Sequence, residues 1–292
     1  VAGGTAQNQE YQFFVLRDPT INAFAMPGGV IGVHTGLIVT SQGESELAGV
    51  LAHEIGHVEQ HHMARMLSRQ GNTTALLLAS ILVAVLAGRS NPNVAGAVLA
   101  GGQAAAIQNQ VNYSRDYERE ADRVGLQILN GSGLDPQGMP DFFERMYQHT
   151  RVVENNAPAY LRTHPLTQDR ISDISGRVRQ IGAKPQPNSV DFVLVRAKIE
   201  AQQFGAQTAI ARFTARPGKT PAEQAARWYG LTQAYLADRK FAEARKALTA
   251  LQALQLDSSM PSMLAADLAA AEGRPGEAAQ ICHAAIVRYP AR

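Results

Sequence analysis

His53, Glu54 and His57 stand in the order H-E-x-x-H within the segment Leu47–His62, and these residue types at this spacing can hydrolyse a peptide bond with the help of a metal. On an α-helix, side chains four positions apart lie on the same face, so the two imidazoles can bind one zinc ion. Glu54 then lies beside the metal, where its carboxylate can take a proton from water and pass it to a leaving amine. We therefore predict His53 and His57 as zinc ligands and Glu54 as the catalytic base and acid.

The residues around this motif argue against a pair of ordinary surface histidines. They are uncharged and mostly apolar, which predicts a helix buried on several sides. Unpaired imidazoles and a carboxylate buried there would cost about 1–3 kcal/mol or more each unless a metal compensates. The positions are Val50, Leu51, Ala52, Ile55, Gly56 and Val58.

A catalytic zinc also needs a third protein ligand and an open fourth position. Cys282 is the only cysteine, so the third ligand must be a His, Asp or Glu elsewhere in the chain. The charged, helical segment Tyr113–Asp122 offers Glu118 and Asp122 four positions apart, so that one could bind the metal while the other holds a ligand histidine. Neighbouring arginines leave a solvated ion-pair face as the alternative: Arg115, Arg119 and Arg123.

Two further histidines follow the motif directly, at His61 and His62. One large class of zinc proteases has a glycine three residues and a histidine six residues after the second motif histidine, but Gln60 and Met63 occupy those positions here. We therefore expect His61 and His62 on the helix surface or in the wall of the cleft. We expect the helix itself to continue to about Ser68.

Two strands are predicted before the motif helix. Tyr11–Leu16 is apolar and aromatic and ends at a turn, and the glycine-flanked run Val30–His34 reads as a second strand. Proteases commonly bind an extended substrate along an exposed strand edge. We take the second strand as the candidate edge, with a packed core hairpin as the alternative, since the sequence does not say which strand is outermost. Its candidate substrate-binding residues are Val30, Ile31, Gly32 and Val33.

The stretch 71–107 has the most unusual composition in the chain. Gly71–Gly88 contains no charged residue, and Val94–Ile107 is rich in alanine and glycine. A membrane-spanning helix needs about 20 predominantly apolar residues, and shorter runs more often form buried or interfacial helices. We favour a mobile hairpin of two helices that caps the cleft over a membrane hairpin. Exposed apolar faces there would suit unfolded clients or a peripheral membrane contact.

The second part of the chain is helical in character and repeats. Ile181–Ser189 is rich in proline and glycine, so we place a domain boundary there and predict domains at 1–182 and 190–292. A plain helical cap is the alternative to a peptide-binding repeat array. The 34-residue spacing of tetratricopeptide repeats fits Trp228, Leu231, Tyr235, Phe241, Ala244 and Leu248.

Composition narrows the function further. The 292 residues suffice for two domains, and a net charge of +2 indicates neither a nucleic-acid nor another polyanionic partner. The chain starts at Val1 without a charged segment followed by an apolar one, so we interpret it as a trimmed or mature fragment. The single cysteine leaves the compartment open.

Several motifs occur together in one order along the chain. They resemble the zinc metallopeptidase family that includes HtpX and the CAAX prenyl proteases, and within it the periplasmic members that carry tetratricopeptide repeats behind the protease domain. The resemblance covers nearly the whole chain. It implies a mainly α (α+β) fold, with a zincin-like metalloprotease domain that contains a small β-sheet, followed by an α-helical repeat domain. The motifs are Asn22–Ala25, His53–His57, Glu118–Asp122, Gly133–Pro136 and Thr163–Pro165.

The same resemblance assigns roles to individual residues. It implies one Zn²⁺ per chain with Glu118 as the third ligand, Asp122 as the residue that holds a ligand histidine, and Glu120 as a non-ligand. His164, which precedes a proline, is most simply a loop residue, but the family implies a resting-state fourth ligand that closes the site. We expect Arg170 to be an ordinary surface charge, although it could support this loop or pair with substrate.

The resemblance also implies a setting and a function. The protein would be a periplasmic zinc endopeptidase that degrades misfolded or stalled envelope proteins. Its repeats would bind clients or the outer-membrane β-barrel assembly machinery. The alternative is a chaperone or assembly adaptor for outer-membrane proteins whose zinc site is plugged and largely silent. The intact Glu54 favours the enzyme, because an adaptor need not keep a base beside the metal.

Overall fold

The computed structural model describes residues 10–66, 68, 114–152, 158–182, 185–216 and 218–290. The hairpin predicted for residues 71–107 therefore lies outside the described residues. The chain forms two compact units. The first comprises Val1–Leu16, Thr20–His34 and Ser45–Gln186, and the second comprises Arg17–Pro19, Thr35–Glu44 and Pro187–Arg292. Among the described residues, no helix is both long and apolar enough to cross a bilayer.

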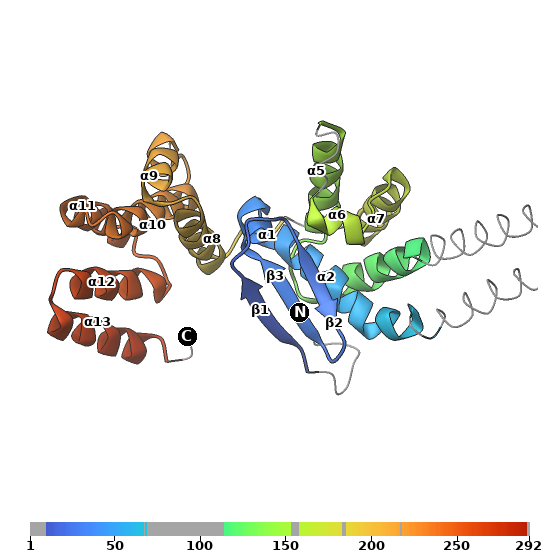
Figure 1. Ribbon diagram of the computed structural model, residues 1–292, viewed down its shortest axis with the longest axis horizontal. Helices are drawn as coiled ribbons and strands as arrows, with labels where there is room; N and C mark the ends of the chain where they lie inside the picture. The colour runs from blue at the N-terminus through green and yellow to red at the C-terminus, as the bar shows by residue number, and fades with distance from the viewer. Residues whose placement is uncertain are drawn as a thin grey trace, which may run out of the picture. The chain divides into compact units, whose positions relative to one another are not determined.

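A three-stranded sheet belongs to the first unit. Its strands are β1 (Gln12–Leu16), β2 (Ala23–Met26) and β3 (Val30–His34), in the order β1-β3-β2 (Figure 1). β1 pairs in parallel with β3, and β2 pairs with it antiparallel. The predictions of strands at Tyr11–Leu16 and Val30–His34 are therefore confirmed within one residue at their ends.

The prediction that Val30, Ile31, Gly32 and Val33 form an exposed edge is wrong. β3 is the central strand and is hydrogen-bonded on both sides. An apolar run without polar alternation is typical of a strand covered on both faces, and Ile31 and Val33 are at most 5% exposed. Gly28 and Gly29 reverse the chain with φ angles of 89° and 82°, so β2 folds back onto β3 and takes the outer position.

The motif lies on α2 (Glu44–Glu59), which follows the short helix α1 (Thr35–Thr40). Helical structure resumes at residues 62–66. The expected continuous helix to Ser68 is therefore wrong, because the chain turns at Gln60–His61, where His61 has a φ angle of +52°. This left-handed conformation is uncommon for a residue other than glycine, and α2 ends at Glu59, two residues after His57.

A second helix, residues 114–131, packs closely against α2. A Cβ atom on Gly56 of α2 would lie 2.7 Å from the carbonyl oxygen of Ala121, and a Cβ on Gly125 would lie 2.9 Å from that of Ala52. The missing side chains let the two backbones touch. Glu118 and Asp122 are thereby brought within reach of the motif histidines.

Three helices complete the described core of the first unit: α5 (Gly138–Val152), α6 (Ala159–Thr163) and α7 (Gln168–Ile181). The residue pattern predicts helices at Met139–His149 and Asp169–Gln180, and the structure forms α5 and α7 there. α7 begins where the Thr167 side chain accepts a hydrogen bond from the Arg170 backbone and ends at the left-handed Gly182. The core side chains are Phe142, Phe143, Met146, Tyr160, Ile171, Ile174 and Val178.

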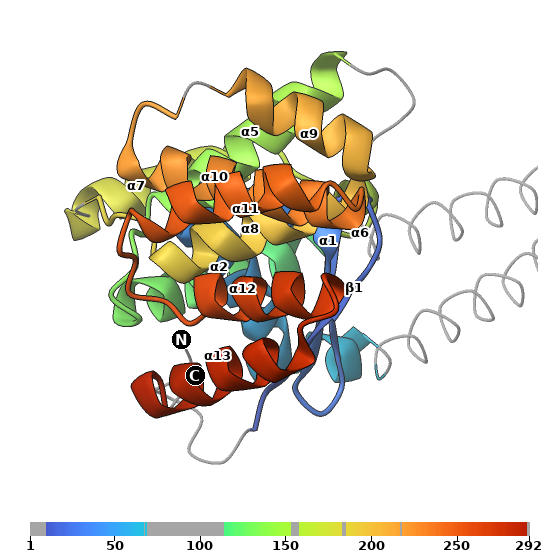
Figure 2. The same cartoon turned by 90° about the vertical axis from the view of Figure 1, so that its left-hand side faces the viewer.

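The second unit is built from successive helix pairs, seen in Figure 2. Its core contains all the positions that fit the repeat spacing, with Leu231, Ala244 and Leu248 buried and Trp228, Tyr235 and Phe241 partly buried. The tetratricopeptide class itself stays a prediction. The helices are α8 (Val190–Gln203), α9 (Ala206–Ala215), α10 (Pro221–Ala237), α11 (Phe241–Gln252), α12 (Met260–Ala271) and α13 (Pro275–Arg288).

The contact between α2 and residues 114–131 makes a prediction about stability. Gly56→Ala should lower the free energy of unfolding by about 1–3 kcal/mol, because the new methyl group overpacks a backbone contact. Gly131→Ala is the matched control, since its Cβ would have no neighbour within 4 Å. It should be neutral or stabilising by about 0.4–1 kcal/mol. Urea denaturation of the metal-free protein measures both, and equal effects would contradict the close-contact explanation.

Candidate metal centre

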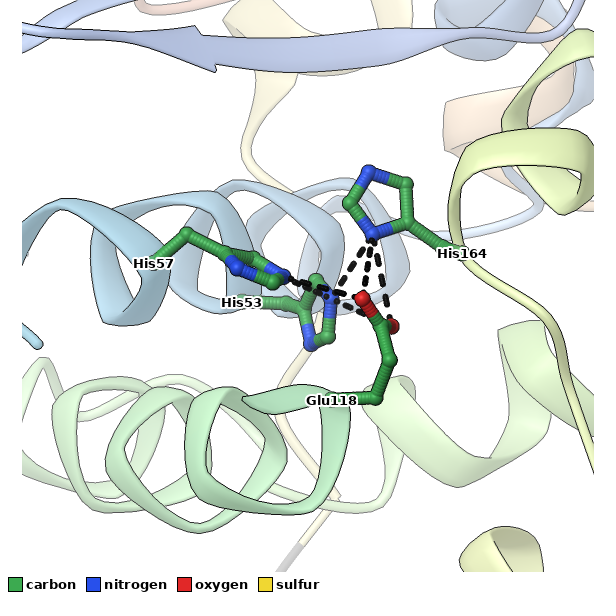
Figure 3. Close-up of side chains that lie close together, drawn as sticks. All are labelled: His53, His57, Glu118 and His164. Atoms are coloured by element: carbon green, nitrogen blue, oxygen red, sulfur yellow. Dashed lines mark hydrogen bonds and ion pairs between the residues drawn. The ribbon is translucent and has the colours of Figure 1, made fainter. Parts of the chain in front are cut away.

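Four side chains from separate parts of the chain converge beneath the sheet. His53 and His57 come from α2 and Glu118 from the helix 114–131, and His164 is the residue at the C-terminal end of α6 (Figure 3). One donor atom from each lies within 4.8 Å of the others. We call these four residues the four-donor cluster. The structure thus brings together the residues that the motifs indicated as ligands.

The spacing inside the cluster is that expected around one ion. His53 Nε2 lies 3.1 Å from His57 Nε2 and 3.4 Å from His164 Nδ1. Glu118 Oε1 lies 3.4 Å from His57 Nε2 and 3.2 Å from His164 Nδ1. Ligands at about 2.0–2.1 Å from a tetrahedral zinc are about 3.3–3.4 Å apart, so these imidazole and carboxylate donors fit a zinc ion.

The buried charge around the cluster also fits a divalent cation. Glu54, Glu118 and Asp122 are at most 4% exposed, and Arg170 is the buried cation that faces two of them. With these carboxylates ionised and the imidazoles neutral, as metal ligation requires, one guanidinium leaves an excess of negative charge. Such an excess is costly to bury unless a cation compensates it.

Asp122 fixes the orientation of the first histidine. Its Oδ1 lies 2.9 Å from His53 Nδ1, which leaves His53 Nε2 turned towards the cluster. Phe143 packs edge-on against the same imidazole, with ring centroids 5.9 Å apart. This is the position that the resemblance implied for Asp122.

The electrostatics of these groups are coupled. Burial opposes the charged form of His53, but hydrogen bonds with Asp122 and Glu118 outweigh it and raise its pKa to about 9. Burial likewise opposes ionisation of both carboxyls. Hydrogen bonds from His164, His53 and His57 nevertheless hold the pKa of Glu118 well below its usual value, and those from Arg170 and His53 lower the pKa of Asp122. Both carboxylates are therefore charged at neutral pH.

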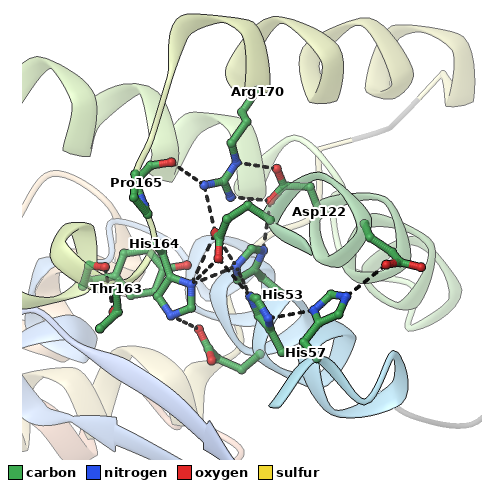
Figure 4. Close-up of polar contacts among 12 residues, drawn as sticks. His53, His57, Asp122, Thr163, His164, Pro165 and Arg170 are labelled. Atoms are coloured by element: carbon green, nitrogen blue, oxygen red, sulfur yellow. Dashed lines mark hydrogen bonds and ion pairs between the residues drawn. The ribbon is translucent and has the colours of Figure 1, made fainter. Parts of the chain in front are cut away.

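Arg170 is buried rather than on the surface, so the expectation of an ordinary surface charge is wrong. Its Nε and Nη2 donate to the two carboxylate oxygens of Asp122 at 2.7 and 2.8 Å (Figure 4). Its Nη1 lies 2.9 Å from Glu118 Oε2 and donates to the Pro165 carbonyl at 2.7 Å. One guanidinium therefore connects the metal centre to the residue that follows His164. Its position on α7, six residues after His164, was the available signal.

His164 lies between Glu54 and the other three residues of the four-donor cluster. Its Nδ1 faces the other donors, while its Nε2 lies 3.4 Å from Glu54 Oε1. Tyr160 stacks on the ring, with centroids 4.7 Å apart and planes at 29°. Glu54 is only 1% exposed, and burial raises the pKa of Tyr160 well above its usual value. No spacing in the sequence pointed to Tyr160.

The two histidines after the motif differ from each other. Both line the cleft described below, as one of the two expectations had it, but His61 is exposed in a turn, whereas His62 is only 3% exposed and contacts His57, Nδ1 to Nδ1, at 2.9 Å. Burial lowers the pKa of His57, and that of His62 to about 4. Glu120 lies outside the cluster, as the resemblance implied, and contacts His62. The break at His61, which the sequence did not reveal, explains why His62 is buried.

A cleft of about 660 Å³ opens onto the cluster. One wall is β2 and its following turn, and the other is formed by the end of α2 and residues 61–66. Glu54, His57, Glu118 and His164 line it together with a large share of apolar side chains. These are Phe24, Ala25, Met26, Pro27, Val58, Met63, Ala64 and Met66.

A metal-binding H-E-x-x-H helix with a distal glutamate, under a small sheet, defines a metallopeptidase domain. Residues 2–178 match the family described as Peptidase family M48, and the chain belongs to this family.

Individual relatives carry the comparison beyond that domain. A putative beta-barrel assembly-enhancing protease of Vibrio cholerae is 38% identical over 265 residues, covering 88% of this chain and 54% of the relative. The beta-barrel assembly-enhancing protease of Escherichia coli is 33% identical over 271 residues, covering 92% and 55%. The mitochondrial metalloendopeptidase OMA1 of Schizosaccharomyces pombe is 30% identical over 165 residues, covering 56% and 46%. The chain spans about half the length of these relatives.

The buried arginine yields a test of its structural role. Arg170→Met should lower the free energy of unfolding of the metal-free protein by about 3–5 kcal/mol, because it leaves Asp122 and Glu118 uncompensated. Arg177→Met, on the same helix, removes a 40% exposed side chain that pairs with Asp173. That control should change stability by less than about 1 kcal/mol. Urea denaturation of the two variants compares them, and a loss of similar size in both would show that Arg170 has no special role.

Proposed function

We propose that this chain contains the catalytic part of a zinc-dependent endopeptidase. His53, His57 and Glu118 are its zinc ligands, and Glu54 is its general base and acid. The observation that carries the proposal is the convergence of four metal-binding donors beside a buried glutamate at the end of an apolar cleft. Membership of Peptidase family M48 supports the same reaction class.

The residues of the chain divide the work of hydrolysis. A zinc ion bound here would polarise the scissile carbonyl and make water more acidic. Glu54 takes a proton from the attacking water as its oxygen bonds to the carbonyl carbon, and delivers that proton to the amine nitrogen as the C–N bond breaks. Asp122 holds His53 in place throughout. The low exposure of Glu54 limits its contact with bulk water.

The cleft suits an extended polypeptide. With β3 in the centre of the sheet, β2 has an outer edge that faces no other strand among the described residues. Phe24, Ala25 and Met26 of this strand line the cleft, so a substrate segment can add to β2 through backbone hydrogen bonds. The opposite wall carries Met63 and Met66, whose flexible side chains accommodate apolar residues of different shapes. We expect cleavage within exposed apolar segments.

His164 closes the site in a resting state. Its imidazole occupies the space between Glu54 and the other three donors, where water and the scissile carbonyl have to enter. Stacking on Tyr160 and the Arg170 contact to the Pro165 carbonyl hold it there. Activation then requires this segment to move away.

The names of the relatives suggest a biological setting. As in proteins named for enhancing β-barrel assembly, we propose that the substrates are misfolded or stalled envelope proteins, cleaved in the periplasm. We assign residues 1–182 to the protease domain and residues 190–292 to a tetratricopeptide-repeat domain. These repeats bind clients or the outer-membrane β-barrel assembly machinery. The paired helices of the second unit support this assignment.

Replacement of the base tests the enzymatic proposal. Glu54→Gln keeps the shape of the side chain but removes the proton acceptor, so casein cleavage by the purified protein should fall at least about 100-fold. Metal content should stay unchanged, and a chelator should abolish the wild-type activity. Casein cleavage that persists in Glu54→Gln or resists the chelator would refute the enzyme and leave the adaptor function.

The resting-state role of His164 has its own test. His164→Ala should raise casein cleavage and self-cleavage, because it opens the position beside Glu54 while three ligands remain. The matched control is Arg162→Ala, an exposed residue two positions earlier, which should behave like the wild type. Digestion time courses followed on gels measure both reactions. Unchanged or lower activity in His164→Ala would count against the plug.

A further inference from the structure

We infer that His62 is a positioning residue for the metal ligand His57, and that the left-handed break at His61 brings it into place. The observation is the direct contact between two imidazoles that a continuous helix would hold apart. The inference uses the proposed role of His57 as a ligand. It concerns metal binding and not proteolysis, so it is tested separately from the enzymatic proposal.

The helix geometry shows why the break is needed. Residues five positions apart on an α-helix are rotated by about 140° about its axis, so His62 would face away from His57 if α2 continued. Instead α2 ends at Glu59, and the amide of His61 donates to the carbonyl of Val58 in a tight turn. The next helical segment starts at His62.

The break stores a small strain at a position where no side-chain chemistry requires it. A non-glycine residue in the left-handed region is strained, and such strain is concentrated at functional sites. His61 itself is exposed, with φ +52°. The conformation of His61 instead allows its neighbour His62 to be buried against His57, with only 3% of its surface exposed.

The hydrogen bonds between these groups can run in one direction only. If His57 offers the Nε2 lone pair to the metal, its proton is on Nδ1, and Nδ1–H donates to His62 Nδ1 at 2.9 Å. His62 must then carry its own proton on Nε2, which donates to Glu120 Oε2 at 3.1 Å. These two hydrogen bonds thus fix the tautomer of His57 that binds metal through Nε2.

Glu120, at the far end of this series of hydrogen bonds, is itself held in place. Arg65 Nη1 donates to the same Glu120 oxygen at 2.7 Å, and its guanidinium lies 4.8 Å from the centre of the Tyr117 ring. The His62 ring stacks on the same Tyr117 ring, with centroids 4.6 Å apart and planes at 22°. His62 is therefore held by packing as well as by hydrogen bonds.

The two motif histidines have different supports for a structural reason. His53 is fully buried and is held by the carboxylate of Asp122. His57 lines the cleft and its side chain is 16% exposed, so water and substrate can reach it. A buried partner on its Nδ1 side keeps the ring in place where the surrounding protein is more open. This is the part of the centre that a bound peptide would disturb first.

The first experiment measures zinc affinity by chelator competition and the unfolding temperature with and without zinc. His62→Phe keeps the ring that stacks on Tyr117 but cannot accept the proton of His57. It should weaken zinc binding about 10–100-fold and reduce the rise in unfolding temperature that zinc produces. His62→Asn can still accept through its side-chain oxygen and should recover part of this loss. His61→Asn, which tolerates the left-handed conformation, is the neighbouring control and should bind zinc as the wild type does.

The second experiment tests the break. His61→Val disfavours the left-handed conformation and should weaken zinc binding, although His61 is outside the four-donor cluster. Adding His62→Phe to it should cause little further loss, because both changes remove the same contact. Zinc affinity of His62→Phe within twofold of the wild type would overturn the inference. So would a fall in unfolding temperature that is equal with and without zinc, since this indicates packing alone. Proteolysis by the wild type has no bearing on any of these outcomes.

Discussion

The structure depends on the burial of several like charges at one point of the first unit. Glu54, Glu118 and Asp122 are almost inaccessible to solvent, and carboxylates this close repel one another in a medium that screens poorly. Arg170 offsets part of this charge. A divalent cation at the four-donor cluster would offset the rest. The helices around the site bring these charged groups together at one point.

That arrangement requires two helices to approach more closely than ordinary side chains allow. Gly56 and Gly125 remove the Cβ atoms at the contact between α2 and residues 114–131, so the carboxylate of one helix reaches the imidazoles of the other. The same closeness lets Asp122 hold His53. The positions of the candidate metal ligands therefore depend directly on how closely the two helices pack. A change that separates the backbones disturbs the ligands even if none of them is replaced.

The supports of the site differ between its buried and its open side. On the buried side Arg170 links Asp122 and Glu118 to the Pro165 carbonyl, so the segment that carries His164 is tied to these two carboxylates. On the cleft side His62 supports His57 through a chain that ends at Glu120. The contacts that hold His164 are therefore separate from those that support His57, so His164 can move without loss of the contact between His62 and His57. The proposed resting state requires such independence if it is to open for substrate.

The sequence by itself determined the local features. These are the H-E-x-x-H helix, the strands β1 and β3, the helices α5 and α7, and the candidates Glu118 and Asp122. These follow from hydrophobic period, turn residues and ligand spacing, all of which act over a few residues. It did not determine the order of the strands. β3 is central because β2 pairs with it as an antiparallel hairpin and β1 pairs with it in parallel. Arg170 and His62 were also decided by the tertiary structure. Whether a charged or polar side chain is buried depends on which distant groups surround it, and on a backbone break at His61 that no local pattern specifies.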